Sequence, residues 1–233
     1  MTATAANSNR ETKTDESNNG APGKIADKIR DLIIRGTLAP GVRLGQSHLA
    51  EMFGTSRVPI REALKLLAAE MLVTHDPNKG FSVAMLSSEE AQQLYQIRHV
   101  LDTELLKTVE WPDEATLNNL RKRLDDLEAL LSEGYSKRQE WMAKHRELHR
   151  AIFELSPRKI LVREVLRLWM LTDRYRSLLP PLDIRNTTDG MMPERHLINA
   201  LAEKNRELLL QVFDKDRTMI EKTLLEILEA RGL

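Results

Sequence analysis

The spacing of hydrophobic residues along the first third of the chain predicts a small domain of helices and one hairpin. Apolar residues recur at helical spacing in three segments: 24–35, 47–53 and 57–70. Two short β-type runs follow on either side of a turn rich in Pro, Asn and Gly: 72–75 and 81–84. Runs placed around such a turn are typical of a β-hairpin. We therefore assign residues 21–87 to one domain.

From Ser88 onward the pattern is helical throughout. Six helical segments are expected: 88–109, 113–133, 137–156, 158–179, 192–203 and 205–230. Proline and glycine residues mark most of the breaks between them. This pattern predicts an all-helical antiparallel bundle over residues 88–233. Residues 1–20 lack apolar periodicity and are predicted to form a disordered tail. The expected fold class is therefore mainly α.

Charge is distributed unevenly between the two predicted domains, although the 233 residues include 35 basic and 35 acidic ones. Residues 21–87 carry nine Lys and Arg against six Asp and Glu, whereas residues 88–233 carry 24 against 26. A DNA-binding surface would therefore belong to the smaller domain. The absence of cysteine excludes disulfides and thiolate catalysis. Without a membrane-length apolar stretch or a signal peptide, we expect a cytoplasmic protein with no membrane partner.

The second and third predicted helices have the spacing of a helix-turn-helix. Ala50 falls where the two helices touch, Gly54 falls in the turn, and Ile60 packs the second helix onto the first. Arg57 and Arg61 are four residues apart near the start of that second helix, so they share one face. This end of a recognition helix meets the major groove, where Arg can bond both O6 and N7 of guanine. The alternative is a plain helical hairpin with solvated arginines.

The segment GVRLGQSHLAEMFGTSRVPIREALKLLAAEMLV, followed by NKGFSV, resembles the winged helix-turn-helix of GntR-type bacterial transcription regulators. The resemblance runs over residues 24–83. It implies that Arg57 and Arg61 read the major groove and that Lys79 and Gly80 enter the minor groove. It also implies two contacts with the DNA backbone, made by Arg43 and Ser56.

Five polar residues interrupt the apolar stripes of the predicted bundle helices: Arg98, His145, His149, Glu194 and Asp216. Burying such a group without a partner costs about 1–3 kcal/mol, so each needs a structural or functional reason. Two histidines one helical turn apart, with two carboxylates, can form a site for a divalent first-row metal. A buried hydrogen-bonded cluster without a metal is the alternative.

The stretch HRELHRAIFELSPRKILVREVLRLW resembles the FCD domain, the ligand-binding bundle of FadR-type GntR regulators. Many FCD domains hold one metal ion with an Asp and three His. The alignment places His145 at the position where FCD domains usually have the Asp ligand. It places His149 at a position where they usually have a His ligand. Glu194 and Asp216 fall on the other two His positions. The resemblance therefore implies one divalent ion, Zn, Ni, Mn or Fe, and it matches Arg98 to an arginine that faces the pocket in such domains.

Together these features predict a dimeric, ligand-responsive transcription regulator, most often a repressor in this family, and not an enzyme. Its partners would be a double-stranded operator with an inverted repeat, a second copy of the chain, and a small carboxylate that pairs with Arg98. An internal salt bridge from Arg98 to Glu194 or Asp216 is the alternative role for that arginine. Two other function classes stay open: a metal-dependent enzyme of the two-His/carboxylate type, and a DNA-binding protein that needs no effector.

Overall fold

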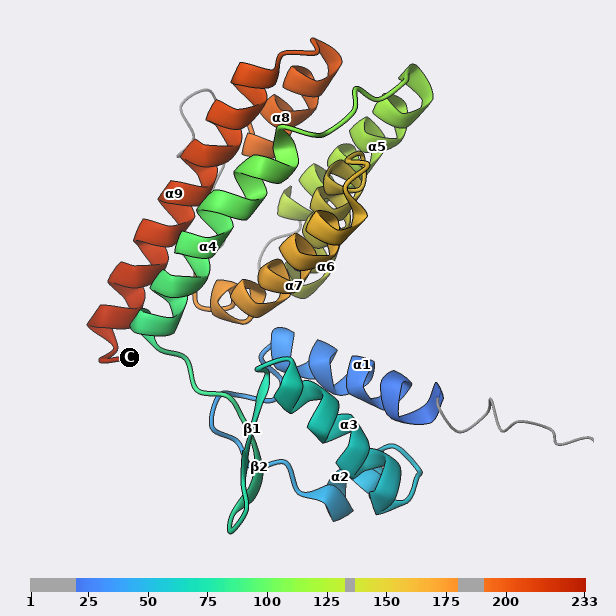
Figure 1. Cartoon of the computed structure of the whole chain (residues 1–233), viewed down its shortest axis with the longest axis vertical. Helices are drawn as coiled ribbons and strands as arrows, with labels where there is room; N and C mark the ends of the chain where they lie inside the picture. Colours follow the sequence, from blue (N-terminus) through green and yellow to red (C-terminus); the bar gives the residue numbers. More distant parts are fainter. Residues whose placement is uncertain (1–19, 133–136, 180–190) are drawn as a thin grey trace, which may run out of the picture. The chain divides into compact units, whose positions relative to one another are not determined.

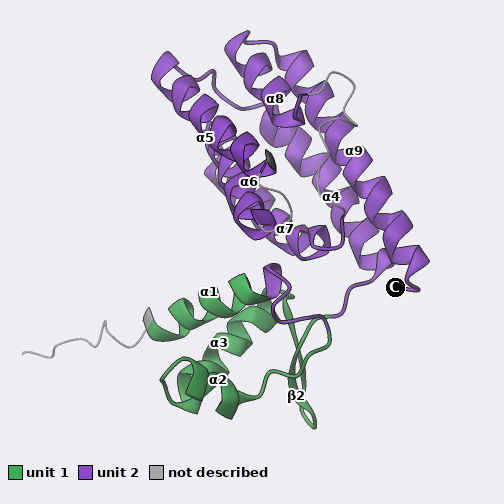
Figure 2. Cartoon of the chain, turned by 180° about the vertical axis from the view of Figure 1, so that it is seen from behind, with its two compact units in different colours: residues 1–32, 41–84 green, residues 33–40, 85–233 purple. Residues whose placement is uncertain are grey.

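The computed structural model describes three stretches of the chain: 20–132, 137–179 and 191–233. Contacts divide the chain into two compact units (Figure 2): 1–32 with 41–84, and 33–40 with 85–233. The predicted disordered tail, 1–20, lies outside the described residues except for Gly20, which is the first residue of a helix rather than part of the tail.

The smaller unit combines three helices with an antiparallel hairpin (Figure 1). Its elements are, in chain order: α1 (Gly20–Ile34), α2 (Gln46–Met52), α3 (Arg57–Ala69), β1 (Val73–Asp76) and β2 (Gly80–Val83). Val73 pairs with Val83 and Asp76 pairs with Gly80, so the chain reverses between the strands at 77–79. This order of elements is the winged helix-turn-helix that the hydrophobic pattern predicts.

The core of the smaller unit lies under the buried face of α3. Ile60 and Leu64 are fully buried, and Ala50 of α2 is buried at 7% exposure, as the helix-turn-helix spacing predicts. Gly54 has a φ of 62°, a left-handed conformation that favours glycine, and it forms the turn between α2 and α3. These packing positions fix the direction of α3 relative to α2.

The larger unit is a bundle of helices. The described residues form six of them: α4 (Ser88–Leu106), α5 (Glu114–Ser132), α6 (Arg138–Phe153), α7 (Lys159–Arg176), α8 (Pro193–Ala202) and α9 (Arg206–Ala230). Each lies within one of the six predicted segments. In Figure 1, α4 runs beside α9, and it also packs against α7, whereas α5 packs against α6 and α8. The mainly α fold class is confirmed.

Aromatic side chains from three helices form the centre of the bundle core. Phe153 of α6, Trp169 of α7 and Phe213 of α9 are in mutual contact, with ring centroids 5.1 to 6.2 Å apart. The break between α8 and α9 has a clear local cause. Lys204 adopts a φ of 54°, and the Asn205 side chain accepts a hydrogen bond from the backbone N–H of Leu208 at 3.0 Å.

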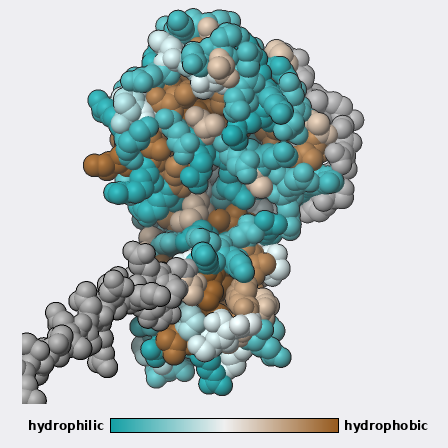
Figure 3. All heavy atoms as spheres, turned by 90° about the vertical axis from the view of Figure 1, so that its right-hand side faces the viewer, coloured by the Kyte–Doolittle hydropathy of each residue, from teal (hydrophilic) through white to brown (hydrophobic). Residues whose placement is uncertain are grey.

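Among the described residues, no helix is both long enough and apolar enough to cross a membrane. Figure 3 shows hydrophilic residues over much of the surface that faces the viewer, with hydrophobic residues in separate smaller areas.

Candidate functional site

The N-terminal end of α3 presents two arginines to solvent. Arg57 and Arg61 lie one helical turn apart on the same face of α3. Both are exposed, because Ile60 and Leu64 on the opposite face are buried in the core. Arg61 Nε lies 3.5 Å from Glu62 Oε1, and the Arg61 side chain is 54% exposed. Such an exposed ion pair is weak, so the guanidinium can turn toward another partner.

The hairpin holds the other predicted contact residues. Asp76 Oδ1 accepts a hydrogen bond from the backbone N–H of Lys79 at 3.2 Å, and Gly80 follows with a φ of 82°. Arg43 donates from Nη2 to the carbonyl oxygen of Lys79 at 3.0 Å, which places Arg43 against the wing. Ser56 is the N-cap residue of α3, and its side chain makes no capping hydrogen bond. The roles of all these residues on DNA stay predictions.

Three of the four predicted metal ligands meet inside the helical unit. His145 Nε2 and His149 Nε2 lie 2.8 and 3.5 Å from the same oxygen, Oε1 of Glu194. The histidines come from consecutive turns of α6 and the glutamate from the first turn of α8, and all three are buried. One donor atom from each lies within 4.8 Å of the others. This group therefore has the donor types and the spacing of a divalent metal site.

The protonation states of this group follow from its burial. Burial lowers the pKa of His145 to about 3, and the positive charge of Arg176 acts in the same direction. Burial alone would raise the pKa of Glu194, but hydrogen bonds from His145 and His149 hold that pKa well below its usual range. His145 is therefore neutral and Glu194 ionised at neutral pH. These are the forms in which both residues bind metals.

Asp216, the fourth predicted ligand, lies outside this group. It is half-buried, and burial together with the charge of Glu194 raises its pKa to about 6. Asp216 lines a neighbouring pocket between α4, α7 and α9, whose accessible volume of about 10 Å³ is close to that of one water molecule. Arginines and aromatic residues form most of the pocket wall: Tyr95, Arg98, Trp169, Arg176, Phe213 and Arg217.

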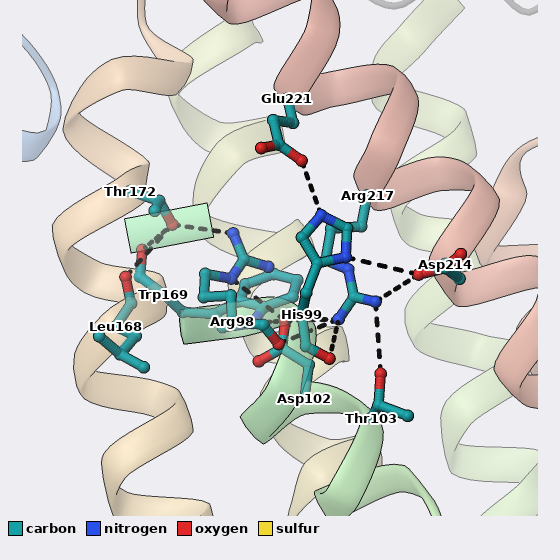
Figure 4. Close-up of polar contacts among 10 residues, drawn as sticks. All are labelled: Arg98, His99, Asp102, Thr103, Leu168, Trp169, Thr172, Asp214, Arg217 and Glu221. Carbon is teal, nitrogen blue, oxygen red and sulfur yellow. Dashed lines mark hydrogen bonds and ion pairs between the residues drawn. The ribbon is translucent and has the colours of Figure 1, made fainter. Parts of the chain in front are cut away.

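Arg98 faces this pocket but is already part of an internal salt bridge (Figure 4). Its Nε donates to Asp102 Oδ2 at 3.1 Å, and its Nη1 donates to Thr172 Oγ1 at 2.9 Å. The guanidinium carbon lies 4.4 Å from the centre of the Trp169 ring. The internal salt bridge is therefore present, although its partner is neither of the two carboxylates expected from the sequence.

Sequence reasoning missed several charged residues that surround the predicted ones. They are Asp102, Asp173, Arg176 and Arg217, all buried. Asp102 follows Arg98 by four residues, a spacing that the sequence does display. Nothing in the spacing shows which partner Asp173 has, and neither of its carboxylate oxygens is hydrogen-bonded within the part of the chain that the structure describes.

Comparison with known families agrees with the two-unit architecture. The family model described as bacterial regulatory proteins of the gntR family matches residues 23–83, and the model of the FCD domain matches residues 93–230. The chain belongs to the FCD-containing GntR family of bacterial transcription regulators. These families are transcription regulators, so the chain is not an enzyme, and its smaller unit is a DNA-binding domain.

Two individual relatives are named as transcription regulators, and one solved structure has the same fold. The chain is 35% identical to the regulator YdhC of Bacillus subtilis over 46% of its own length, and the match spans about half, 49%, of that relative. It is 31% identical to the transcriptional repressor GlaR of Escherichia coli, over 64% of this chain and 70% of GlaR. The structure of E. coli McbR/YncC shares the fold, with a TM-score of 0.76 and 22% identity over 91% of this chain and 99% of that one.

Proposed function

We propose that this GntR-family regulator is a ligand-responsive repressor that acts in the cytoplasm as a homodimer on an inverted-repeat operator. A single recognition helix offers few base contacts, and two copies related by two-fold symmetry double them. Arg57, Arg61, Lys79 and Gly80 would contact the grooves, and Arg43 and Ser56 the DNA backbone. The relative named as a repressor supports the sign of the regulation.

The effector would be a small carboxylate metabolite that binds in the pocket between α4, α7 and α9. The observation that carries this proposal is the presence of three buried arginines in the wall of one pocket: Arg98, Arg176 and Arg217. A planar guanidinium matches a carboxylate in two parallel hydrogen bonds. Because the accessible volume is only about 10 Å³, side chains of the wall must move when the effector enters. A DNA-binding protein without an effector would not need such a wall.

A divalent ion would be held by His145, His149 and Glu194. The residues fit a metal because three buried donors converge and Oε2 of Glu194 has no hydrogen-bond partner among the described residues. The ion, Zn, Ni, Mn or Fe, would supply a Lewis acid for an oxygen of the effector. Asp216 would face the pocket beside it. Nδ1 of each histidine has no hydrogen-bond partner among the described residues; a hydrogen bond at this atom orients a histidine that binds a metal and strengthens its binding.

Elemental analysis of purified protein tests the metal proposal. We expect the wild-type protein to hold one ion per chain after dialysis against buffered metal, and His149→Ala to lose most of it. His99→Ala, which removes a histidine of α4 outside the three-residue group, is the matched control and should stay loaded. Full loading of His149→Ala would leave a hydrogen-bonded cluster as the better account.

Operator binding in the presence of an effector tests the repressor proposal. Arg98→Ala alone would leave Asp102 buried without its partner, a change that typically costs about 3–5 kcal/mol and can unfold the bundle. The paired variant Arg98→Met with Asp102→Asn removes both charges. We expect this variant to bind an operator, obtained by selection from random DNA, as tightly as wild type and to lose the response to effector. An unchanged response would remove Arg98 from the site.

A further inference from the structure

Arg176 differs from the other two arginines of the pocket, because it has no counter-ion in contact among the residues that the structure describes. It is the last residue of α7, it is only 8% exposed, and its Nε is buried without a hydrogen-bond partner in the described chain. Arg98, by contrast, is paired with Asp102. Arg217 is paired with Asp214 and donates to the backbone oxygen of Arg98 at 3.0 Å.

A buried guanidinium without an anion is costly, because desolvation of the charge is not compensated. The positive charge of Arg176 interacts with two carboxyl groups, those of Asp173 and Asp216. By itself this interaction lowers the pKa of both groups. Neither carboxylate forms a hydrogen bond or ion pair with Arg176 among the described residues. Burial raises the pKa of both carboxyl groups above the usual value, that of Asp216 to about 6. Within the part of the chain that the structure describes, the guanidinium of Arg176 therefore remains able to bind an anion in the pocket.

The pocket wall shows what kind of molecule would bring that anion. Arg98 and Arg176 belong to different helices, α4 and α7, and both line the same pocket. The same lining includes apolar side chains, those of Trp169, Phe213 and Ile220, together with the charged residues Asp216 and Arg217. Two guanidinium groups and apolar side chains in one pocket match a short carbon chain that carries an acidic group at each end.

We infer that Arg176 is a second anion-binding residue of this pocket and that the effector is a short dicarboxylate. This inference rests on the proposed carboxylate effector, whose first carboxylate pairs with Arg98. The second carboxylate binds the guanidinium of Arg176. A monocarboxylate leaves Arg176 without an anion and binds more weakly.

Calorimetric titration of the full-length protein tests this inference with matched probes. The probes are succinate, glutarate and adipate, each compared with its half-amide, which has the same length and one charge fewer. For at least one length we expect wild type to bind the diacid about tenfold or more tightly than the half-amide, as for a hydrogen-bonded charge pair. Arg176→Gln should remove this difference and leave the affinity for the half-amide within about twofold.

Arg163→Gln is the matched control, because Arg163 is an exposed arginine on the same helix and its side chain is 73% exposed. It should preserve the preference for the diacid. If Arg176→Gln does not fold, Arg176→Lys keeps the charge without the planar fork and should retain only part of the preference.

Each other outcome overturns the inference in a recognisable way. Equal binding of diacid and half-amide by wild type, or an unchanged preference in Arg176→Gln, overturns the role of Arg176 and leaves the proposed carboxylate effector standing. If no acid of either series binds, the inference and the carboxylate part of the proposed function fail together.

Discussion

At the scale of single residues, the two exposed arginines of α3, the predicted recognition helix, should carry most of the base recognition. Arg57→Ala and Arg61→Ala should each weaken specific operator binding by about 1–3 kcal/mol, since each removes a side chain able to bond a base pair. Lys79→Ala should weaken binding to all sequences alike and lower the salt slope by up to about one. Fluorescence anisotropy over a range of salt concentrations measures both effects.

Lys24→Ala, an exposed lysine of α1 outside these elements, is the control for loss of one positive charge. If neither arginine variant changes operator affinity, α3 does not read the groove with this face.

The buried histidine of the three-residue group should make the helical unit sensitive to acid. The pKa of His145 is about 3 in the folded chain and about 6.5 when unfolded, so the unfolded chain binds more protons between these values. The free energy of unfolding should therefore fall as pH decreases from about 6.5 toward 3, with a slope of at most about 1.4 kcal/mol per pH unit from this group. Urea unfolding of chelator-treated protein at several pH values measures how the free energy of unfolding depends on pH.

His145→Gln retains a hydrogen-bond donor to Glu194 but does not titrate, so its stability should depend less on pH in this window. His196→Gln, on α8, is the matched control for loss of a histidine. The same pH slope in His145→Gln and wild type would mean that His145 is not buried in its neutral form.

The sequence predicts four of the polar residues of the bundle that turn inward, but it does not predict their partners. Arg98, His145, His149 and Glu194 are all buried, as their positions on the apolar stripes require. The partner of Arg98 depends on the rotation of α7 against α4, which brings Thr172 to within 2.9 Å. Helical periodicity sets the buried face of each helix separately, and the pairing of two faces is a tertiary property.

At the scale of elements, α7 connects the pocket of the proposed effector with the start of α4. Trp169 and Arg176 of α7 line the pocket. The neighbouring Tyr175 donates a hydrogen bond from its hydroxyl group to Glu90, in the first turn of α4, and accepts one from the backbone N–H of Ser87 at 3.4 Å. Movement of α7 around a bound effector would therefore act directly on the chain that leads into α4.

Tyr175→Phe removes these two hydrogen bonds and keeps the buried ring. We expect the free energy of unfolding to fall by about 1–2 kcal/mol, since the Ser87 amide and Glu90 lose a partner. Hydrogen exchange at the amides of residues 87–91 should become faster, because the N-terminal end of α4 is held less firmly. Mass spectrometry of exchanged peptides measures this.

Tyr95→Phe is the matched control, because the hydroxyl group of Tyr95 is buried without a hydrogen-bond partner in the described residues. Its removal should leave the stability unchanged or raise it. Equal loss of stability in both variants would show that the hydrogen bonds of Tyr175 contribute nothing specific.

At the scale of the whole molecule, the chain carries two hydrophobic cores, one in each compact unit. Leu67 is fully buried in the smaller unit, and Leu148 is fully buried in the larger one. Compact units that each have buried apolar residues can unfold separately. A regulator that passes a signal between two such units relies on their connection rather than on one shared core.

Calorimetric unfolding of the full chain should therefore show two transitions. Leu67→Ala should lower one transition and Leu148→Ala the other, each by an amount that corresponds to about 2–5 kcal/mol for a buried leucine. Operator DNA should raise only the transition that Leu67→Ala lowers, because a ligand stabilises the unit that binds it. A single transition that both substitutions lower equally would show that the two units unfold as one cooperative body. A proposed effector could then act on the DNA-binding unit by stabilising the whole chain, and not only through the segment that connects the units.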